Sequence, residues 1–204
     1  MMVQFLWSIG MWSWVLASTA AQPDNCQLKK DKDGVRVFTC PSDTSKFRSL
    51  RAEFMLENVS LTELAEFMLD GDNYKNWQFH TMESKVLERR ERQIIYRVVI
   101  DAPWPVSNRE IFVELTVIPQ SETRMLLSMH SIPYPYPVDD DLVRVPFSQS
   151  QWNIEKVHQG LKVIYHMNID PGGYVPPMLI NMAMAEGPYQ SFRNIKQLMK
   201  SRKR

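Results

Sequence analysis

Residues that could do chemistry are few and scattered along this chain of 204 residues. The four histidines lie in different segments and form no grouping with cysteines or carboxylates at the spacing of metal ligands. They are His80, His130, His158 and His166. Neither a glycine-rich phosphate loop nor a nucleophile elbow is present in the sequence. We therefore predict no metal, no cofactor and no catalytic centre.

The two cysteines, Cys26 and Cys40, flank a segment with the pattern of a β-hairpin. Its natural turn is residues 32–34, where glycine supplies the positive φ of a three-residue loop. If Asp31 pairs with Val35, the two cysteines lie directly opposite each other, about 4.5 Å apart at Cα, which a disulfide tolerates. We expect this disulfide to form, and two reduced thiols are the alternative.

The N-terminal segment 1–21 carries no charge, and its apolar run at 3–16 is followed by small residues at 17–21. This pattern predicts a cleavable secretory signal, cut after Ala20 or Ala21, and hence a secreted or periplasmic protein. The alternative is an uncleaved N-terminal membrane anchor, although the run is shorter than the ~20 apolar residues of a spanning helix. A disulfide favours export, because oxidising compartments preserve disulfides.

The composition favours one domain with a sizeable core, since 44% of the 204 residues are hydrophobic. We place this domain at residues 24–200 and a basic tail at 201–204. The net charge of +1 provides no basic excess for neutralising phosphates. Nucleic acid is therefore excluded as a partner, and we expect a monomer.

Strand-like runs fill most of the domain, between one early and one late helix. The early helix begins with a capping box formed by Ser60 and Glu63, ahead of an apolar helical stripe. We expect strands at 82–89, 93–101, 109–118, 124–131, 142–155 and 161–170, and the late helix at 177–200. A succession of strands bracketed by helices indicates an α+β fold.

Alternation within the strands predicts one apolar face that is rich in aromatic residues and methionine. The strand residues on this face include Tyr96, Val98, Ile111, Val113, Met125, Leu127, Met129, Trp152, Tyr165 and Met167. The late helix adds Met178, Met182 and Tyr189 from its apolar stripe. Arg97 and Glu110 belong to the opposite face. The same inward-facing side chains could also be ordinary core packing.

Arg109 has the same parity as the apolar residues of its strand. A buried guanidinium is expensive unless it is paired. Arg109 therefore either binds the polar end of a ligand or is held structurally by main-chain carbonyls and a carboxylate. We expect the structural role.

Several motifs follow one another in a recognisable order. Residues 101–110, Asp-Ala-Pro-Trp-Pro-Val-Ser-Asn-Arg-Glu, join two strands through a double-proline corner, and residues 170–176, Asp-Pro-Gly-Gly-Tyr-Val-Pro, precede a Met-rich helix. Residues 74–77, Tyr-Lys-Asn-Trp, suit an aromatic turn. Together with the hairpin at 33–38 and the dipeptide Val143-Arg144, these motifs resemble the StAR-related lipid-transfer (START) family over residues 34 to 200.

The resemblance implies a helix-grip fold, in which a curved antiparallel sheet wraps on a long C-terminal helix and encloses a hydrophobic tunnel. The inward-facing residues named above, with Arg109, would line this tunnel. It also implies a carrier or sensor of one lipid, a sterol or an acyl lipid, with transient membrane contact. Two alternatives stay open: a polyketide cyclase or aromatase-like enzyme, in which Arg109, Tyr96 and Tyr165 orient the substrate, and an interaction domain with a filled cavity.

Overall fold

The computed structural model describes residues 25–41 and 49–202. The leader expected at residues 1–21 lies outside these ranges, as do the last two residues of the basic tail. Within the described part of the chain, no helix is long and apolar enough to cross a membrane.

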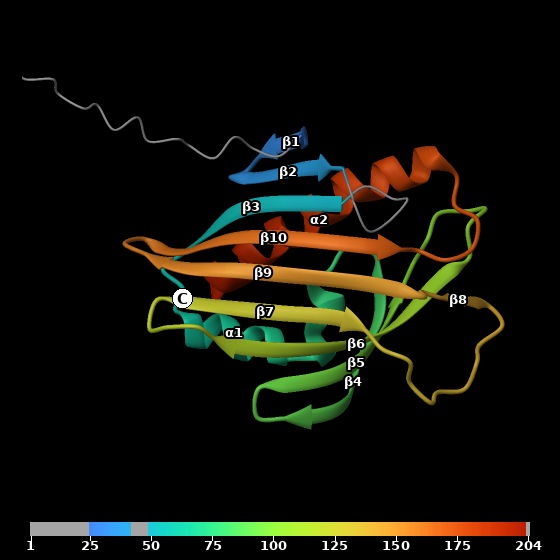
Figure 1. The fold of residues 1–204 in the computed structure, drawn as a ribbon, viewed down its shortest axis with the longest axis horizontal. Coiled ribbons are helices and arrows are strands. Elements are labelled where there is room, and N and C mark those ends of the chain that lie inside the picture. Colours follow the sequence, from blue (N-terminus) through green and yellow to red (C-terminus); the bar gives the residue numbers. More distant parts are fainter. Residues whose placement is uncertain (1–24, 42–48, 203–204) are drawn as a thin grey trace, which may run out of the picture.

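One large sheet dominates the structure (Figure 1). Its strands are β1 (Gln27–Lys32), β2 (Val35–Cys40), β3 (Ser49–Glu57), β4 (Thr81–Arg90), β5 (Gln93–Ile100), β6 (Asn108–Pro119), β7 (Arg124–Ser131), β8 (Leu142–Arg144), β9 (Phe147–Val157) and β10 (Gly160–Asp170). They follow the order β1-β2-β3-β10-β9-β7-β6-β5-β4, with every pair antiparallel. The short β8 pairs in parallel with the start of β6.

The helices lie together on one side of the curved sheet. They are α1 (Leu61–Leu69), the short 3-10 helix η1 (Gly71–Asn76) and α2 (Pro177–Ser201). Figure 1 shows α1 and α2 behind the sheet, so the viewer faces its convex side. A curved antiparallel sheet closed by a long C-terminal helix confirms the α+β helix-grip architecture.

The predicted element boundaries hold for most of the chain, and the exceptions have physical causes. Ser60 and Glu63 form the reciprocal capping box of α1. The run expected at 142–155 is two strands, β8 and β9, because Pro146 interrupts it and cannot donate a ladder hydrogen bond. Strand β3 was not predicted, although Leu50, Ala52, Phe54 and Leu56 alternate with polar or half-buried neighbours along it.

The first hairpin forms the predicted disulfide, but its turn and its strand register differ from the prediction. Its turn has two residues, Asp33 and Gly34, both at positive φ, and Lys32 pairs with Val35. This turn is one residue shorter than expected. A register shift between residues 28 and 30 compensates for the difference, so that Leu28 pairs with Phe38.

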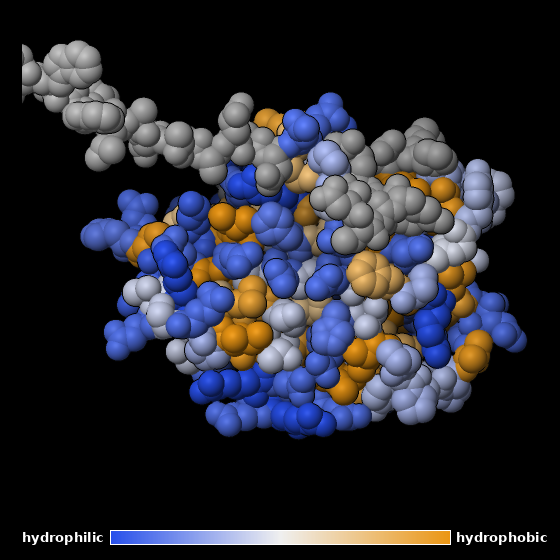
Figure 2. Space-filling view, viewed as in Figure 1, coloured by the Kyte–Doolittle hydropathy of each residue, from blue (hydrophilic) through white to orange (hydrophobic). Residues whose placement is uncertain are grey.

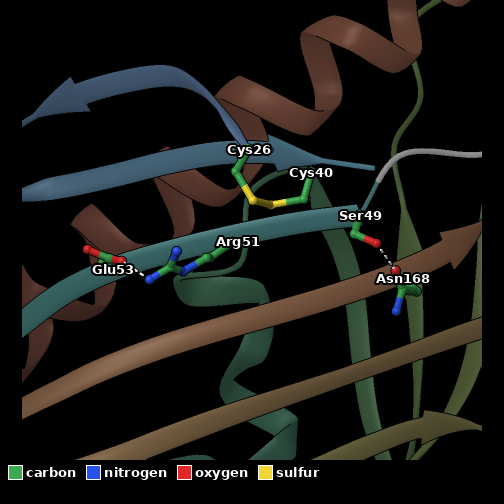
Figure 3. The surroundings of a disulfide bond; sticks show 6 residues. All are labelled: Cys26, Cys40, Ser49, Arg51, Glu53 and Asn168. Carbon is green, nitrogen blue, oxygen red and sulfur yellow. Dashed lines mark hydrogen bonds and ion pairs between the residues drawn. A yellow bond between two sulfur atoms is a disulfide. The ribbon is translucent and has the colours of Figure 1, made fainter. Parts of the chain in front are cut away.

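The disulfide between Cys26 and Cys40 is confirmed, with 4.1 Å between the Cα atoms. It closes the open end of the β1–β2 hairpin (Figure 3). Beside it, the Ser49 hydroxyl donates to the Asn168 side chain and so links β3 to β10. The disulfide therefore stands at the end of the sheet where β2 and β10 end and β3 begins.

The hairpin also contacts α2, from the middle of this helix to its second half. Lys30 forms an ion pair with Glu186, and the Tyr189 hydroxyl donates to the Asp33 carboxylate. Lys196 donates to the main-chain carbonyl of Asp33 at 3.0 Å. These contacts fix α2 against the edge of the sheet, so that its buried face is held over the concave side.

The convex side and the sheet edges carry mainly polar side chains. Figure 2 shows hydrophilic residues gathered along the edge formed by β4 and β5, with small apolar patches elsewhere on this face. The hydrophobic core lies on the opposite, concave side, between the sheet and the helices.

Candidate functional site

The concave face contains the residues that the sequence assigns to a tunnel. The buried ones are Tyr96, Val98, Ile111, Val113, Met125, Leu127, Met129, Trp152, Tyr165 and Tyr189, and Met167 is partly buried beside them. They belong to one hydrophobic cluster between sheet and helices. The side chains of Met178 and Met182 lie outside the described part of the structure. The face is apolar, as an acyl chain or a ring system requires.

Aromatic rings form the centre of this face where α2 meets the sheet. Phe192 of α2 stacks on Phe54 with 4.6 Å between ring centroids, and it contacts Trp152 at 5.3 Å and Tyr165 at 5.1 Å. Phe54 was not among the predicted site residues, because β3 was not recognised as a strand. Its alternation with Leu56 was the available signal.

Three buried tyrosines bring hydroxyl groups into this interior. Tyr74 and Tyr96 meet edge to face at 4.8 Å, and the Tyr96 hydroxyl donates weakly to the Met129 sulfur at 3.8 Å. Burial raises the pKa of Tyr96 well above its usual range and raises the pKa of Tyr165 to about 12. The phenols are therefore neutral at physiological pH and can serve as hydrogen-bonding groups.

Arg109 is the charged member of the inward-facing set. It is the second residue of β6, pairs with Ile100 of β5, and is 7% exposed. Its guanidinium donates to the carbonyl of Ser107, and burial lowers its pKa. Within the described residues it forms no ion pair with a carboxylate. One of the two structural partners expected for Arg109 is therefore present and the other is missing.

The neighbouring residue Glu110 points to the convex side and is 1% exposed. Its carboxylate accepts hydrogen bonds from Arg97 at 2.8 Å and from Arg144 at 2.7 and 2.9 Å. The sequence analysis placed Arg97 and Glu110 on this face but did not predict that they are buried. The segment 132–141 covers them, held by the stacking of Tyr134 on Phe112 at 5.5 Å. The signal was Phe112, a large aromatic at an outward-facing position.

Two surface depressions lie away from the residues predicted to line the tunnel. One, of about 490 Å³, lies between the end of α2 and the β3–α1 connection, and the other, of about 210 Å³, lies on the convex side over β9 and β10. None of the predicted tunnel residues lines either of them. Across the described ranges, no three His, Cys, Asp or Glu side chains gather as metal ligands.

One end of the sheet exposes large apolar side chains. We call it the loop end: the connections 101–107, 132–141 and 171–176 meet there, where β5, β7 and β10 end and β6 begins. Trp104 is 91% exposed, Tyr174 83% and Val138 78%, one in each connection. Arg109 lies just inside this end, at the start of β6.

Comparisons with known sequences agree on one family. The family model described as START domain matches residues 13–203. An uncharacterised protein of Pseudomonas aeruginosa is 24% identical over 185 residues, covering 89% of this chain and 90% of that protein. The phosphatidylcholine transfer protein of Mus musculus is 26% identical over 167 residues, covering 79% of this chain and 77% of that protein.

A solved structure shares the fold over nearly the whole domain. It is the STAR-related lipid transfer protein of Xanthomonas axonopodis, which superposes with a TM-score of 0.79 at 24% sequence identity. The superposition covers 87% of this chain and 99% of that one. The curved sheet with its long C-terminal helix is therefore a shared architecture.

Proposed function

Because the chain belongs to the START domain family, we propose that it binds one amphiphilic lipid between the concave face of the sheet and α2 and carries it as a monomer. The observation that carries this proposal is Arg109. It is a buried cation without a carboxylate partner among the described residues, at the loop end of an otherwise apolar face. Such an arrangement suits a ligand with an anionic head and a long apolar body.

The energetics favour this class of ligand. Each CH₂ group removed from water contributes about 0.8 kcal/mol, so an acyl chain needs few polar contacts in the interior. A phosphate or carboxylate at Arg109 would accept charge-assisted hydrogen bonds from the guanidinium and compensate its buried charge. The name of the mouse relative, phosphatidylcholine transfer protein, supports a phosphate-bearing lipid.

Binding without catalysis is the second part of the proposal. An aromatase-like enzyme would use Tyr96 and Tyr165 with Arg109 to orient its substrate; burial raises the pKa of both phenols, so they can donate hydrogen bonds but do not serve as ionised general bases at physiological pH. The histidines His80 and His130 pair with carboxylates on exposed parts of the structure, away from the concave face. These features favour a carrier over a cyclase.

Export from the cytoplasm is the third part. The Cys26–Cys40 disulfide supports an oxidising compartment, in agreement with the secretory leader expected at residues 1–21. A lipid carrier in such a compartment would move its cargo between membranes or deliver it from one.

The loop end is the surface that we propose for transient membrane contact. Trp104 and Tyr174 are amphipathic aromatic residues, which favour the boundary between lipid headgroups and acyl chains. Their connections adjoin the start of β6, where Arg109 would hold a lipid headgroup. Docking by this end would place the ligand's head next to the membrane from which it came.

Native mass spectrometry tests the carrier proposal directly. The mature chain is incubated with vesicles of phosphatidylcholine and phosphatidylglycerol and then separated from them. We expect one retained lipid for each protein molecule and transfer of labelled lipid from donor to acceptor vesicles. A protein that retains no lipid and transfers none would have a filled interior, and the carrier proposal would be wrong.

Membrane contact has a separate test. Trp104→Ala should slow transfer between vesicles while leaving the amount of lipid retained in solution unchanged, because Trp104 does not belong to the concave face. Replacement of Trp77, which is buried near η1, by Phe is the matched control. Equal transfer rates for Trp104→Ala and wild type would contradict docking through the loop end.

A further inference from the structure

A buried hydrogen-bond donor on the concave face has no acceptor in the structure. The indole Nε1 of Trp152 is inaccessible to solvent and makes no hydrogen bond, and the residue is 2% exposed. Buried polar groups are almost always paired, because an unpaired donor loses its hydrogen bond to water without replacement. An unpaired N–H on the wall of a proposed binding site therefore requires an explanation.

We propose that the Trp152 indole binds an oxygen acceptor on the lipid at a point remote from its headgroup. This inference rests on the proposed function, and it makes Trp152 a specificity-determining residue. The chain of a preferred ligand would carry a hydroxyl, a keto group or an ester carbonyl. An unsubstituted chain would leave the donor unpaired.

The surroundings of Trp152 provide no alternative acceptor. Its ring contacts the rings of Phe54 at 5.8 Å, Phe192 at 5.3 Å and Tyr165 at 5.5 Å between centroids, so its neighbours are aromatic. Tyr165 pairs with Trp152 across β9 and β10, and its hydroxyl forms a hydrogen bond with Ser150. None of the described protein atoms therefore accepts a hydrogen bond from the Trp152 indole, and a ligand oxygen could do so.

The register of the sheet separates Trp152 from Arg109. Trp152 pairs with Leu127 of β7, which pairs with Val117 of β6. Val117 follows Arg109 by eight residues on the same strand and face, about 26 Å along an extended strand. A lipid with its anionic head at Arg109 would therefore reach Trp152 only with the far part of its chain.

Trp77 provides a natural comparison for this donor. Its Nε1 is also buried and unpaired, but the rings that Trp77 contacts belong to Phe67 of α1 and Tyr74 of η1, and none belongs to a strand. A loss of the N–H group at Trp77 should therefore not affect how the chain of a ligand is recognised. This makes Trp77→Phe the matched control for Trp152→Phe.

The test uses three single-chain probes: octadecanoate, its 2-hydroxy derivative and its 18-hydroxy derivative, titrated into the wild-type mature chain and both variants. A neutral hydrogen bond corresponds to about a 2- to 12-fold change in affinity. We expect Trp152→Phe to reduce the preference for 18-hydroxyoctadecanoate over octadecanoate by this factor. Its relative affinity for the 2-hydroxy probe should not change, and Trp77→Phe should change neither preference.

The outcomes separate this inference from the proposed function. If all three probes bind and the three proteins show the same preferences, a buried water or nothing pairs with Trp152, and only the inference is overturned. If no probe binds to wild type, the proposed function fails together with it. Because Trp152 lies in the core, the indole N–H resonance of wild type is a second readout. It should move downfield with the 18-hydroxy probe and not with octadecanoate, and an unmoved resonance would overturn the inference.

Discussion

Arg109 and Glu110 are neighbours in β6, both are buried, and they face opposite sides of the same sheet. On the convex side, Glu110 receives three hydrogen bonds from Arg97 and Arg144. On the concave side, Arg109 has one carbonyl, that of Ser107, and no carboxylate among the described residues. The convex charge is compensated by the protein itself, whereas the concave charge has no carboxylate partner among the described residues, and we propose that a ligand compensates it.

The difference follows from what covers each face. Segment 132–141 closes over Glu110, and Arg144 in β8, which follows this segment, donates from Nε and Nη2 to one oxygen of the Glu110 carboxylate. The concave face is covered by α2 and by other apolar side chains, which cannot neutralise a guanidinium. We therefore expect the buried charge of Glu110 to stabilise the fold and the buried charge of Arg109 to bind a ligand. Mutations should distinguish these two roles.

The largest effect is expected on the convex side. Glu110→Gln removes a buried negative charge between two guanidinium groups, and breaking such a network typically costs about 3–5 kcal/mol of unfolding free energy. Thermal and urea denaturation should show this loss equally with and without lipid. Glu114→Gln, four residues further along the same face and partly exposed, is the control and should change little. A small loss for Glu110→Gln would mean that the convex charges are not a structural unit.

Arg109→Met should affect lipid affinity strongly and stability only slightly, in contrast to Glu110→Gln. The unfolding free energy of the lipid-free protein should change by less than about 1 kcal/mol, because an isolated buried charge is replaced by an apolar side chain of similar length. Affinity for anionic lipids should fall about 10- to 100-fold, as expected when hydrogen bonds to a charged group are lost. Melts with and without lipid measure both quantities. If Arg109→Met instead lowers the unfolding free energy of the lipid-free protein strongly, Arg109 has the structural role that the sequence predicted.

Ile100→Glu gives Arg109 the partner that it lacks. Ile100 is half-buried and directly opposite Arg109 on the neighbouring strand, so a glutamate there can form an ion pair with the guanidinium. We expect about tenfold weaker binding of anionic lipid, because the site would already be neutralised. The uncharged variant Ile100→Gln should bind more tightly than Ile100→Glu. Equal affinities of the two variants would contradict an electrostatic role for Arg109.

The smallest effect concerns the concave tyrosines at high pH. Burial raises the pKa of Tyr165 from 10.0 to about 12 and that of Tyr96 further. A raised pKa favours the neutral phenol in the folded state, so this contribution to stability is complete below pH 10 and declines as pH rises toward 12. Absorbance of tyrosinate should therefore still increase as the pH rises from 10 toward 12, because Tyr165 and Tyr96 ionise late. Ionisation of all tyrosines together near pH 10 would indicate that water reaches Tyr96 and Tyr165, and the prediction would be wrong.

The sequence predicted the parts of the site that depend on local patterns. Alternation placed Tyr96, Trp152 and Arg109 correctly on the buried face, and the capping box located α1. It could not show that Glu110 is buried, because a strand pattern gives the face of a residue but not what covers that face. The cover is segment 132–141, whose position depends on long-range contacts.

The unpaired N–H of Trp152 could not be predicted either, because it also depends on neighbours from distant parts of the sequence. Alternation shows that the side chain points inward, but only the packed positions of Phe54, Tyr165 and Phe192 show that no acceptor is nearby. Both Arg109 and Trp152 were therefore foreseen as residues of the interior. Their missing partners became visible only in the fold.

The register shift in β1 has a consequence for comparing this protein with its relatives. A two-residue turn followed by the irregularity between Leu28 and Lys30 brings Cys26 opposite Cys40, as a three-residue turn with a regular strand would also do. An insertion in the turn and a deletion at the bulge would thus cancel, leaving the cysteines opposed. Alignment gaps in this hairpin belong between the cysteines, and the disulfide is the fixed reference from which residues should be counted.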